Sequence, residues 1–256
     1  MEPDVNVFAL RGIPLIQKGD DITRIICTAA EIREGDIICI ASTIVSKAKG
    51  YSRQLAGVIP GEQAVRIGSK TGEDPRSLQV VLDQAVDVII ETPFTLTQLP
   101  SGHIGVRSGV DASNVEEGTA IFLPPDPMAD ASLIADEIED LTGVRCRIIL
   151  TDTCGRAFRR GQTGHAIGWS GMEAIRDFRG DTDLFGRVLE ITEEAVIDEI
   201  AGFANLIMGE SNNGVPAVLF RGCPFWSGHN SIFFRREEDI IRRALQKKES
   251  VRNGSD

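Results

Sequence analysis

Short runs rich in isoleucine and valine, each bounded by Gly, Pro or Asp, limit the folds open to this chain more than any other feature. They predict β-strands, because β-branched side chains favour extended backbone and the bounding residues favour turns. The expected strands are 6–10, 36–42, 86–91, 103–107, 119–123, 144–150, 187–191 and 216–221. Some alternate with helical patterns, whereas residues 94–109 predict a hairpin that turns at Pro100, Ser101 and Gly102. This mixture predicts an α+β fold with mixed, largely antiparallel sheets and flanking helices.

Helices are predicted between many of these strands. Asp20 or Asp21 is expected to cap a helix with an apolar face, and Thr192 is expected to cap another that runs to about Met208. Residues 128–141 predict an acidic amphipathic helix, and residues 237–247 predict the last one. The fragment GSKTG, which begins at Gly68, follows a helical pattern rather than a strand, so it predicts a helix end and not a phosphate loop.

Charge and apolar content exclude several classes of protein. Asp plus Glu total 38 against 27 for Lys plus Arg, and a net charge of -11 repels nucleic-acid phosphates. No apolar run approaches the roughly 18 to 20 residues that span a bilayer. The 5 cysteines are scattered without CxxC spacing, which indicates reduced thiols rather than disulfides or a zinc site. We therefore expect a cytoplasmic protein that binds neither nucleic acid nor membranes.

The stretch RIILTDTCGRAFRRGQTGHAIGW carries the strongest chemical signal. Its apolar run predicts a buried strand that delivers Asp152 and Thr153 to a site just past its end. A carboxylate and a hydroxyl are hard oxygen ligands suited to Mg²⁺ or Mn²⁺. The following glycine-rich loop brings Arg156, Arg159 and Arg160 together, and their guanidinium groups suit phosphate or carboxylate oxygens. The alternative interpretation is that Asp152 caps a turn and the arginines are solvated.

Other segments carry weaker signals of the same kind. Asp111 lies in a turn-like sequence with Asn114, and Ser42 and Lys47 follow a predicted strand with a hydroxyl and an amine that suit a nucleotide. Pro14 makes another strand exit rigid. Each of these signals alone is more often structural than functional.

Together and in order, these segments resemble the coenzyme F-420:L-glutamate ligase family. The resemblance covers about residues 7 to 245 and has the short form, with ligase segments alone. It is carried by GIP, GDDI, GDIICIAST, IVSKAKG, SGVDASNV, LPPDP, IILTDTCGRAFRRGQTGHAIG, RDFRGDTDLFGRVLEITEEAVIDEIAGFANLIMGE and PAVLFRG. So long a series in fixed order is far more specific than one short motif.

The resemblance implies a family-specific fold, an intertwined homodimer, and a GTP-dependent ligase that adds L-glutamate through a γ-glutamyl amide bond to a phosphate-bearing deazaflavin. The substrates are small molecules. Two divalent cations, Mg²⁺ or Mn²⁺, are implied, with K⁺ as a further candidate. The implied nucleotide contacts are Ile13, Pro14, Leu15, Ile16, Ser42, Lys47, Asn114, Met208, Gly209, Glu210, Ser211 and Val215.

The same resemblance implies the metal ligands. Asp111 and Asp152 would hold one cation, Thr153 would contribute to binding the second, and Glu210 is a candidate for a further metal ligand. The chemistry agrees, because amide formation needs an activated carboxylate and GTP can supply an acyl phosphate. Arg156, Arg159 and Arg160 would hold the transferred phosphoryl group or the acidic substrates.

Departures from the family pattern fall mainly on the expected acceptor side. They are Arg107, Ser108, Gly164 and His165. The sequence therefore predicts the use of GTP and metal more specifically than it predicts the acceptor or the number of glutamates added. A paralogous ligase with another acceptor, a metal-dependent phosphohydrolase and a nucleotide-sensing module remain as alternatives. Residues 1–246 are expected to form the catalytic region, with no readable boundary between two subdomains, and residues 247–256 a flexible tail.

Overall fold

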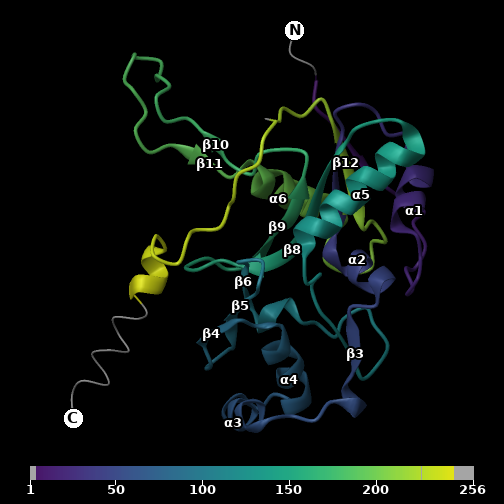
Figure 1. The fold of residues 1–256 in the computed structure, drawn as a ribbon, viewed down its shortest axis with the longest axis vertical. Coiled ribbons are helices and arrows are strands. Elements are labelled where there is room, and N and C mark those ends of the chain that lie inside the picture. The colour runs from purple at the N-terminus through teal and green to yellow at the C-terminus, as the bar shows by residue number, and fades with distance from the viewer. Residues whose placement is uncertain (1–3, 226, 245–256) are drawn as a thin grey trace.

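The computed structural model describes residues 4–225 and 227–244 of the chain, and a five-stranded central sheet forms its core. In this sheet β2 and β8 pair in parallel, while the other neighbouring strands are antiparallel (Figure 1). The predicted α+β class with largely antiparallel sheets is therefore confirmed. The strands, in spatial order, are β1 (Asn6–Ala9), β12 (Ala217–Arg221), β2 (Ile37–Ala41), β8 (Arg147–Gly155) and β9 (Gln162–Ser170).

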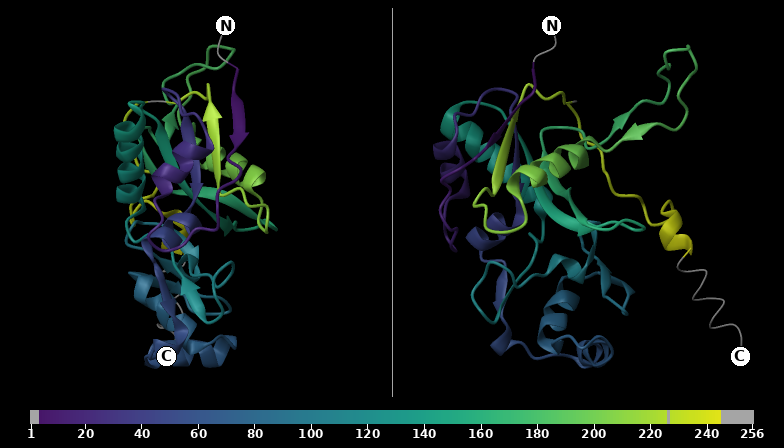
Figure 2. Two further views of the ribbon diagram at one scale, coloured as in Figure 1. Left: turned by 90° about the vertical axis from the view of Figure 1, so that its right-hand side faces the viewer. Right: turned by 180° about the vertical axis from the view of Figure 1, so that it is seen from behind.

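Helices cover both faces of the central sheet, because its buried strands are apolar on both sides. Ile38 and Ile148 belong to the apolar cluster beneath α1 (Ile22–Ala29) and α5 (Pro127–Thr142). Their neighbours Cys39 and Ile149 belong to the opposite cluster, beneath α6 (Val196–Met208). Figure 2 shows α6 on the face opposite α1 and α5.

Residues 50–123 form a small lobe at the lower end of the view in Figure 1. The predicted hairpin is confirmed there, since β5 and β6 pair antiparallel and Gly102 donates its N–H to the Leu99 carbonyl across the turn. The lobe contains a three-stranded and a two-stranded antiparallel sheet. Its elements are β3 (Ser52–Gln54), η1 (Leu55–Gly57), α3 (Glu62–Thr71), α4 (Pro75–Gln84), β4 (Asp87–Ile90), β5 (Leu96–Gln98), β6 (Ile104–Val106), η2 (Arg107–Gly109) and β7 (Thr119–Ile121).

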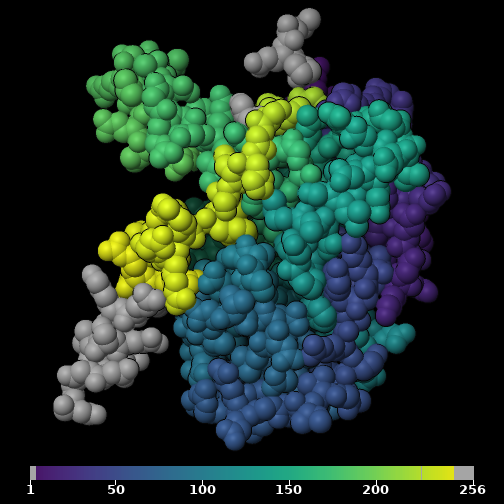
Figure 3. Space-filling view, viewed as in Figure 1, coloured from purple at the N-terminus to yellow at the C-terminus, as the bar shows by residue number. Residues whose placement is uncertain are grey.

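Two segments extend away from the sheet. One is the protruding segment, residues 178–192, which lies beyond the short strands β10 (Arg176–Asp177) and β11 (Glu193–Glu194). The other is the C-terminal arm, residues 222–225 and 227–244, which ends in a helical turn at 240–244. Figure 3 shows the arm, in yellow, lying against the blue surface of the small lobe. Among the described residues, no helix combines the length and the apolar character needed to cross a bilayer.

Several helix predictions agree with the structure at their ends. Asp21 caps α1 by accepting the Arg24 N–H, and α3 ends at Thr71 inside the GSKTG fragment. The stretch 41–50, which follows β2, contains the helix α2 (Ser42–Lys49). Thr192 is not a cap, because α6 begins after Ala195, two residues beyond β11. The predicted helix 237–247 begins in turns at 237–239, and its last part and the tail 247–256 lie outside the described residues.

One strand prediction is wrong, and another has different bounds. Residues 187–191 form no strand, and Val188 makes one isolated bridge with Thr182, because this segment lies outside any sheet. The strand predicted at 144–150 begins at Arg147 and continues to Gly155. Its extension pairs with β9, a strand that sequence reasoning missed, so Asp152 and Thr153 lie inside the strand and not past its end. A register shift between Leu150 and Thr151 bends the ladder before these two residues.

Candidate active site

A cavity of about 410 Å³ lies where β2 passes into α2, next to the extension of β8. Segments that are far apart in sequence meet there: the exit from β1, the start of α2, the turn after η2, β8, and the return loop 208–216 that follows α6. Every residue predicted for the nucleotide or the metal lines this cavity. They are Ile13, Pro14, Leu15, Ile16, Ser42, Lys47, Asp111, Asn114, Asp152, Thr153, Met208, Gly209, Glu210, Ser211 and Val215. The structure thus brings this set together, and the binding role of each member stays a prediction.

The N-terminus of α2 faces the cavity. Ala41, Ser42 and Thr43 line it, and Ala41 is an extended N-cap without a side-chain hydrogen bond to the helix. The first N–H groups of α2 therefore have no capping side chain, and such groups attract anions. Lys47 lies one turn further along, where burial lowers the pKa of its ammonium group. This end of the cavity suits a phosphate.

Asp152 forms the opposite wall. Burial raises the pKa of its carboxyl group to about 6, and the nearby carboxylates of Asp111 and Glu210 add to the shift. Its Oδ1 lies 3.4 Å from the Ser42 hydroxyl. Within residues 4–225 and 227–244, no Lys, Arg or His forms an ion pair with any of these three acids. Converging carboxylates without a cationic partner fit a divalent cation.

The donor set is small for a metal centre. The described residues contain no group of three or more His, Cys, Asp or Glu placed to hold a metal ion. Asp111, Asp152 and the Thr153 hydroxyl instead form an oxygen-rich wall of the cavity. Mg²⁺ characteristically takes one or two carboxylates from a protein and completes its shell with water and substrate phosphates. The residues present fit that kind of partial protein shell.

Asp111 is held in place by its own turn. Its carboxylate accepts the N–H groups of Ala112 at 2.7 Å and of Ser113 at 3.1 Å, and also the Ser113 hydroxyl. Asn114 next to it has a left-handed backbone with φ 52°, a conformation that Asn tolerates. The turn explains why a short Asp-Ala-Ser-Asn sequence can present both a carboxylate and an amide to one cavity.

The departures Arg107 and Ser108 have a packing role just before this turn. Both have a left-handed backbone, with φ 56° and 55°. The Ser108 hydroxyl donates to the Val81 carbonyl at 2.9 Å, and the Ser108 N–H donates to the Thr97 hydroxyl at 3.0 Å. The Arg107 side chain pairs with Glu73. These contacts tie the backbone just before the Asp111 turn to α4 and β5 within the small lobe.

The arginine loop lies outside the cavity. Arg156, Arg159 and Arg160 are exposed on residues 156–161, the connection between β8 and β9, and none of them lines the 410 Å³ cavity. Arg156 lies close enough to the Cys154 thiol to offset part of the rise in its pKa that burial causes. The start of the loop therefore lies close to Cys154, near the end of β8. The catalytic role predicted for these arginines stays a prediction.

A second cavity of about 280 Å³ borders the same β8–β9 ladder, and sequence reasoning missed it. His103 and His165 line it as a stacked pair, with ring centroids 4.7 Å apart and Nε2 atoms 3.4 Å apart. Burial lowers their pKa values to about 3 and about 4. His103 precedes β6 and His165 lies in β9, so no local sequence pattern could have revealed the pair.

Comparisons with known proteins agree with this arrangement. A sequence profile described as "F420-0:Gamma-glutamyl ligase" matches residues 12–222. A protein of Archaeoglobus fulgidus called "Coenzyme F420:L-glutamate ligase" is 44% identical over 246 residues, which cover 95% of this chain and 98% of that protein.

Two more relatives carry the same description. The Methanosarcina mazei protein is 46% identical over 93% of this chain and 96% of its own length, and the Haloarcula marismortui protein is 42% identical over 97% and 100%. The profile covers both walls of the 410 Å³ cavity, and the relatives match nearly the whole chain. The chain therefore belongs to the F420-0:gamma-glutamyl ligase family.

Proposed function

We propose that this protein is a GTP-dependent ligase that joins the amine of L-glutamate to a carboxylate of a phosphate-bearing deazaflavin, the precursor of coenzyme F-420. The observation that carries the proposal is the 410 Å³ cavity, in which a helix N-terminus and a lysine face carboxylates that form no ion pair with any described residue. That pairing suits a nucleotide whose phosphates are shared between the protein and metal ions. The names of the relatives supply the acceptor and the amino acid.

The nucleotide would occupy the cavity with its phosphates toward α2. The N–H groups at Ser42 and the Lys47 ammonium group would bind phosphate oxygens. Residues 13–16 and the return loop 208–216 would enclose the rest, because they form the remaining walls. Asn114 adds an amide that can donate and accept hydrogen bonds.

Asp111 and Asp152 would hold one divalent cation, Thr153 would contribute to a second, and Glu210 would close the shell from the return loop. Such cations, Mg²⁺ or Mn²⁺, neutralise the charge on the phosphates as the phosphoryl group transfers. K⁺ is a further candidate. Asp152 would have to be ionised to serve as a ligand, and a bound cation favours the ionised form although burial disfavours it.

The reaction would have two steps. An acceptor carboxylate oxygen attacks the γ-phosphorus of GTP, and the bond to the β,γ-bridging oxygen breaks to give an acyl phosphate and GDP. The glutamate amine then attacks the acyl carbon, inorganic phosphate leaves, and the amine loses its extra proton to water. The arginine loop, which carries Arg156, Arg159 and Arg160, would attract the anionic substrates to the end of the ladder.

Turnover of GTP with one component omitted at a time tests this function. We expect sustained GDP formation, in proportion to ligated product, only when GTP, Mg²⁺ or Mn²⁺, L-glutamate and the deazaflavin are all present; without glutamate, GDP should form only with the acyl phosphate of the first step. A phosphohydrolase with the same acids would release GDP without glutamate or acceptor. A paralogous ligase would form GDP with another amino acid or another acceptor, and a sensing module would form none.

A homodimer is part of the proposal. The protruding segment exposes large apolar side chains that no described residue covers, among them Leu184, Phe185 and Ile191. Figure 1 shows this segment well away from the central sheet. A second copy of the chain would bury these side chains, and exposed apolar patches commonly mark such contacts.

A further inference from the structure

The 280 Å³ cavity borders the same strand pair, β8 and β9, as the 410 Å³ cavity. Its lining includes Cys154 and His165 from the β8–β9 ladder, and Asp152, a wall of the larger cavity, pairs with His165 in that ladder. The small lobe supplies His103, and the C-terminal arm closes the far side. Neither the predicted nucleotide residues nor the predicted metal ligands line it. The cavity is therefore a separate space that shares one strand with the first.

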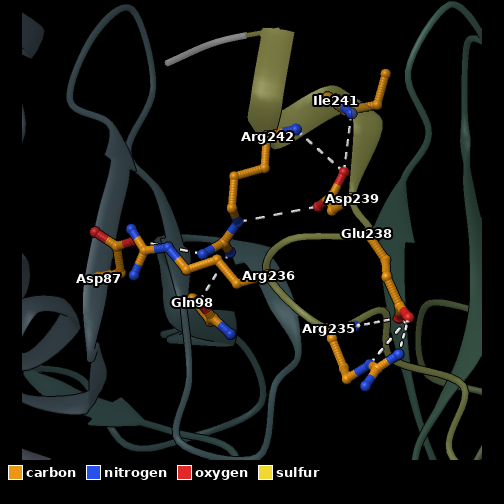
Figure 4. Close-up of polar contacts among 8 residues, drawn as sticks. All are labelled: Asp87, Gln98, Arg235, Arg236, Glu238, Asp239, Ile241 and Arg242. Carbon is orange, nitrogen blue, oxygen red and sulfur yellow. Dashed lines mark hydrogen bonds and ion pairs between the residues drawn. The ribbon is translucent and has the colours of Figure 1, made fainter.

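Two arginines and two acids, Asp87 and Asp239, meet at its far end. Arg236 and Arg242 reach from the arm toward the small lobe, as Figure 4 shows. Their guanidinium groups share a single oxygen of Asp87, at 3.2 Å and 3.5 Å. Arg242 is buried and donates to Gln98, but its Nε and Nη1 make no hydrogen bond with any described residue. One carboxylate oxygen between two guanidinium groups leaves donors for further carboxylates.

Asp239 does not neutralise this end fully. Its Oδ2 lies 4.0 Å from the Arg242 Nε, beyond hydrogen-bond distance. Its Oδ1 accepts the N–H groups of Ile241 and Arg242, at 2.9 Å and 3.1 Å, where the last helical turn begins (Figure 4). The Asp239 carboxylate thus serves mainly to start that turn.

The near end is anionic. Asp198, in the first turn of α6, lines the cavity, and its Oδ1 accepts the Ala166 N–H at 2.8 Å. Burial raises the pKa of the Asp198 carboxyl group, because it disfavours the ionised form. A cation bound next to Asp198 would stabilise that ionised form. Ala166 follows His165, which is the ladder partner of Asp152, so the anionic end lies near Asp152.

The histidine pair adds no charge between the two ends. With pKa values lowered to about 3 and about 4, both rings are neutral near pH 7. The Nδ1 atom of His165 is buried and has no hydrogen-bond partner among the described residues. A ligand that filled the space between the charged ends could supply that partner.

We propose that this cavity binds L-glutamate, with the ammonium group on Asp198 and the carboxylates on Arg236 and Arg242. The size suits an amino acid, Asp198 offers a carboxylate for the ammonium group, and Arg236 and Arg242 offer guanidinium donors beyond those that face Asp87 and Asp239. The orientation places the amine at the end nearest Asp152, where an acyl phosphate would form. The identity of the amino acid rests on the proposed function, whereas the charge pattern stands by itself.

Binding measured by ligand-observed NMR tests this assignment, with the full-length protein, Mg²⁺ and a non-hydrolysable GTP analogue present. The probes are L-glutamate and glutarate, which has both carboxylates but no amine. Arg236→Gln should weaken both probes about tenfold, the scale of one lost charged hydrogen bond. Asp198→Asn should weaken glutamate about tenfold and leave glutarate unchanged, because the amide oxygen can still accept the Ala166 N–H.

Arg235→Gln is the matched control. Arg235 is the neighbouring exposed arginine, it pairs with Glu237 and Glu238, and it does not line the cavity, so both probes should bind it as they bind the natural protein. The assignment is overturned if Arg236→Gln and Asp198→Asn bind glutamate normally, or if Asp198→Asn weakens both probes equally. This experiment measures binding and not turnover, so its outcome can be distinguished from a failure of the proposed ligase function.

Discussion

The buried, ionised carboxylate of Asp152 lowers the free energy of unfolding of the ligand-free protein. Its carboxyl pKa is about 6 in the folded chain, against an ordinary value of about 3.9. The folded state therefore holds a proton more tightly than the unfolded state, and the stabilisation from that proton is lost as the pH rises from about 4 through about 6. At neutral pH the cost is up to about 3 kcal/mol. A bound cation would remove it.

We predict that Asp152→Asn abolishes ligation and raises the stability of the ligand-free protein at pH 7.5. The amide keeps the shape but removes the charge, so unfolding in urea should require up to about 3 kcal/mol more free energy. The gain should vanish below about pH 4, where the natural carboxyl group is protonated in both states. Mn²⁺ with GTP should raise the Tm of the natural protein and have little effect on the variant.

Asp136→Asn, an exposed change on α5, serves as the control and should alter neither activity nor the pH dependence. Turnover near the natural rate at saturating Mg²⁺ in Asp152→Asn would show that this carboxylate is no metal ligand.

Some residues of the larger cavity follow a readable local pattern, and the others were implied only by the family resemblance. Lys47 follows a strand, and Asp111 lies in a turn of short polar residues. The glutamate residues proposed above had no such pattern. Asp198 is an acid in the first turn of a helix, and Arg242 is a base in the last helix. The helix dipole alone explains why each residue type stands there, so neither position indicates a binding site. Only the folded chain brings them to one cavity.

At the scale of elements, β9 determines how the site is built. It lies between α5 and α6 with glycines where a side chain would collide. A Cβ at Gly168 would lie 2.3 Å from the Pro127 carbonyl oxygen, and one at Gly164 would lie 2.5 Å from that of Ala201. The departure at Gly164 is thus explained by close packing against α6. The departure at His165 places an imidazole in the second cavity.

We predict that Gly164→Ala destabilises the protein by about 1 to 3 kcal/mol, the usual cost of forcing a methyl group into a packed interior. The methyl group would also push against Asn205, whose helix leads into the return loop. GTP affinity should therefore fall together with stability. Urea unfolding and calorimetric titration of GTP measure the two effects.

Gly57→Ala is the matched change, because a Cβ there meets no atom within 4 Å. It should be close to neutral in both measurements. If Gly164→Ala were as neutral as Gly57→Ala, the close packing of β9 on α6 would be wrong.

Elements with a local signal were predicted well, and those defined by distant partners were not. The hairpin of β5 and β6 has its turn residues in sequence, and α1 has its capping Asp21. The β9 strand begins among glycines and polar residues, and it is extended because it pairs with β8. Residues 187–191 show the converse, since β-branched residues without a partner strand remain outside a sheet.

At the scale of the whole molecule, the apolar protruding segment predicts a homodimer. Replacing both Leu184 and Phe185 by Asp should convert a dimer into a monomer, because four charges would have to be buried across a twofold contact. Sedimentation velocity measures the mass directly. Val65→Asp, a change at an apolar residue that is 45% exposed on α3, should leave the dimer intact. A monomeric natural protein at micromolar concentration would contradict this prediction.

The relation between lobes was not predictable from sequence. Composition does not change at residue 50 or residue 123, and the small lobe is joined to the rest partly by the arm, through the ion pair of Arg236 with Asp87. The two cavities border one strand pair, and segments from both lobes complete them. Such an arrangement depends on packing between segments more than a hundred residues apart, for which a single sequence gives no local sign.

The central claim is that the larger cavity activates a carboxylate by phosphorylation, and transfer of oxygen tests it most directly. The deazaflavin acceptor is prepared with ¹⁸O in its reacting carboxylate and incubated with the protein, GTP, Mg²⁺ and L-glutamate. The account predicts that each molecule of inorganic phosphate released during ligation carries one oxygen from that carboxylate. Phosphate without ¹⁸O, formed while amide product accumulates, would contradict the acyl phosphate and the role given to this site.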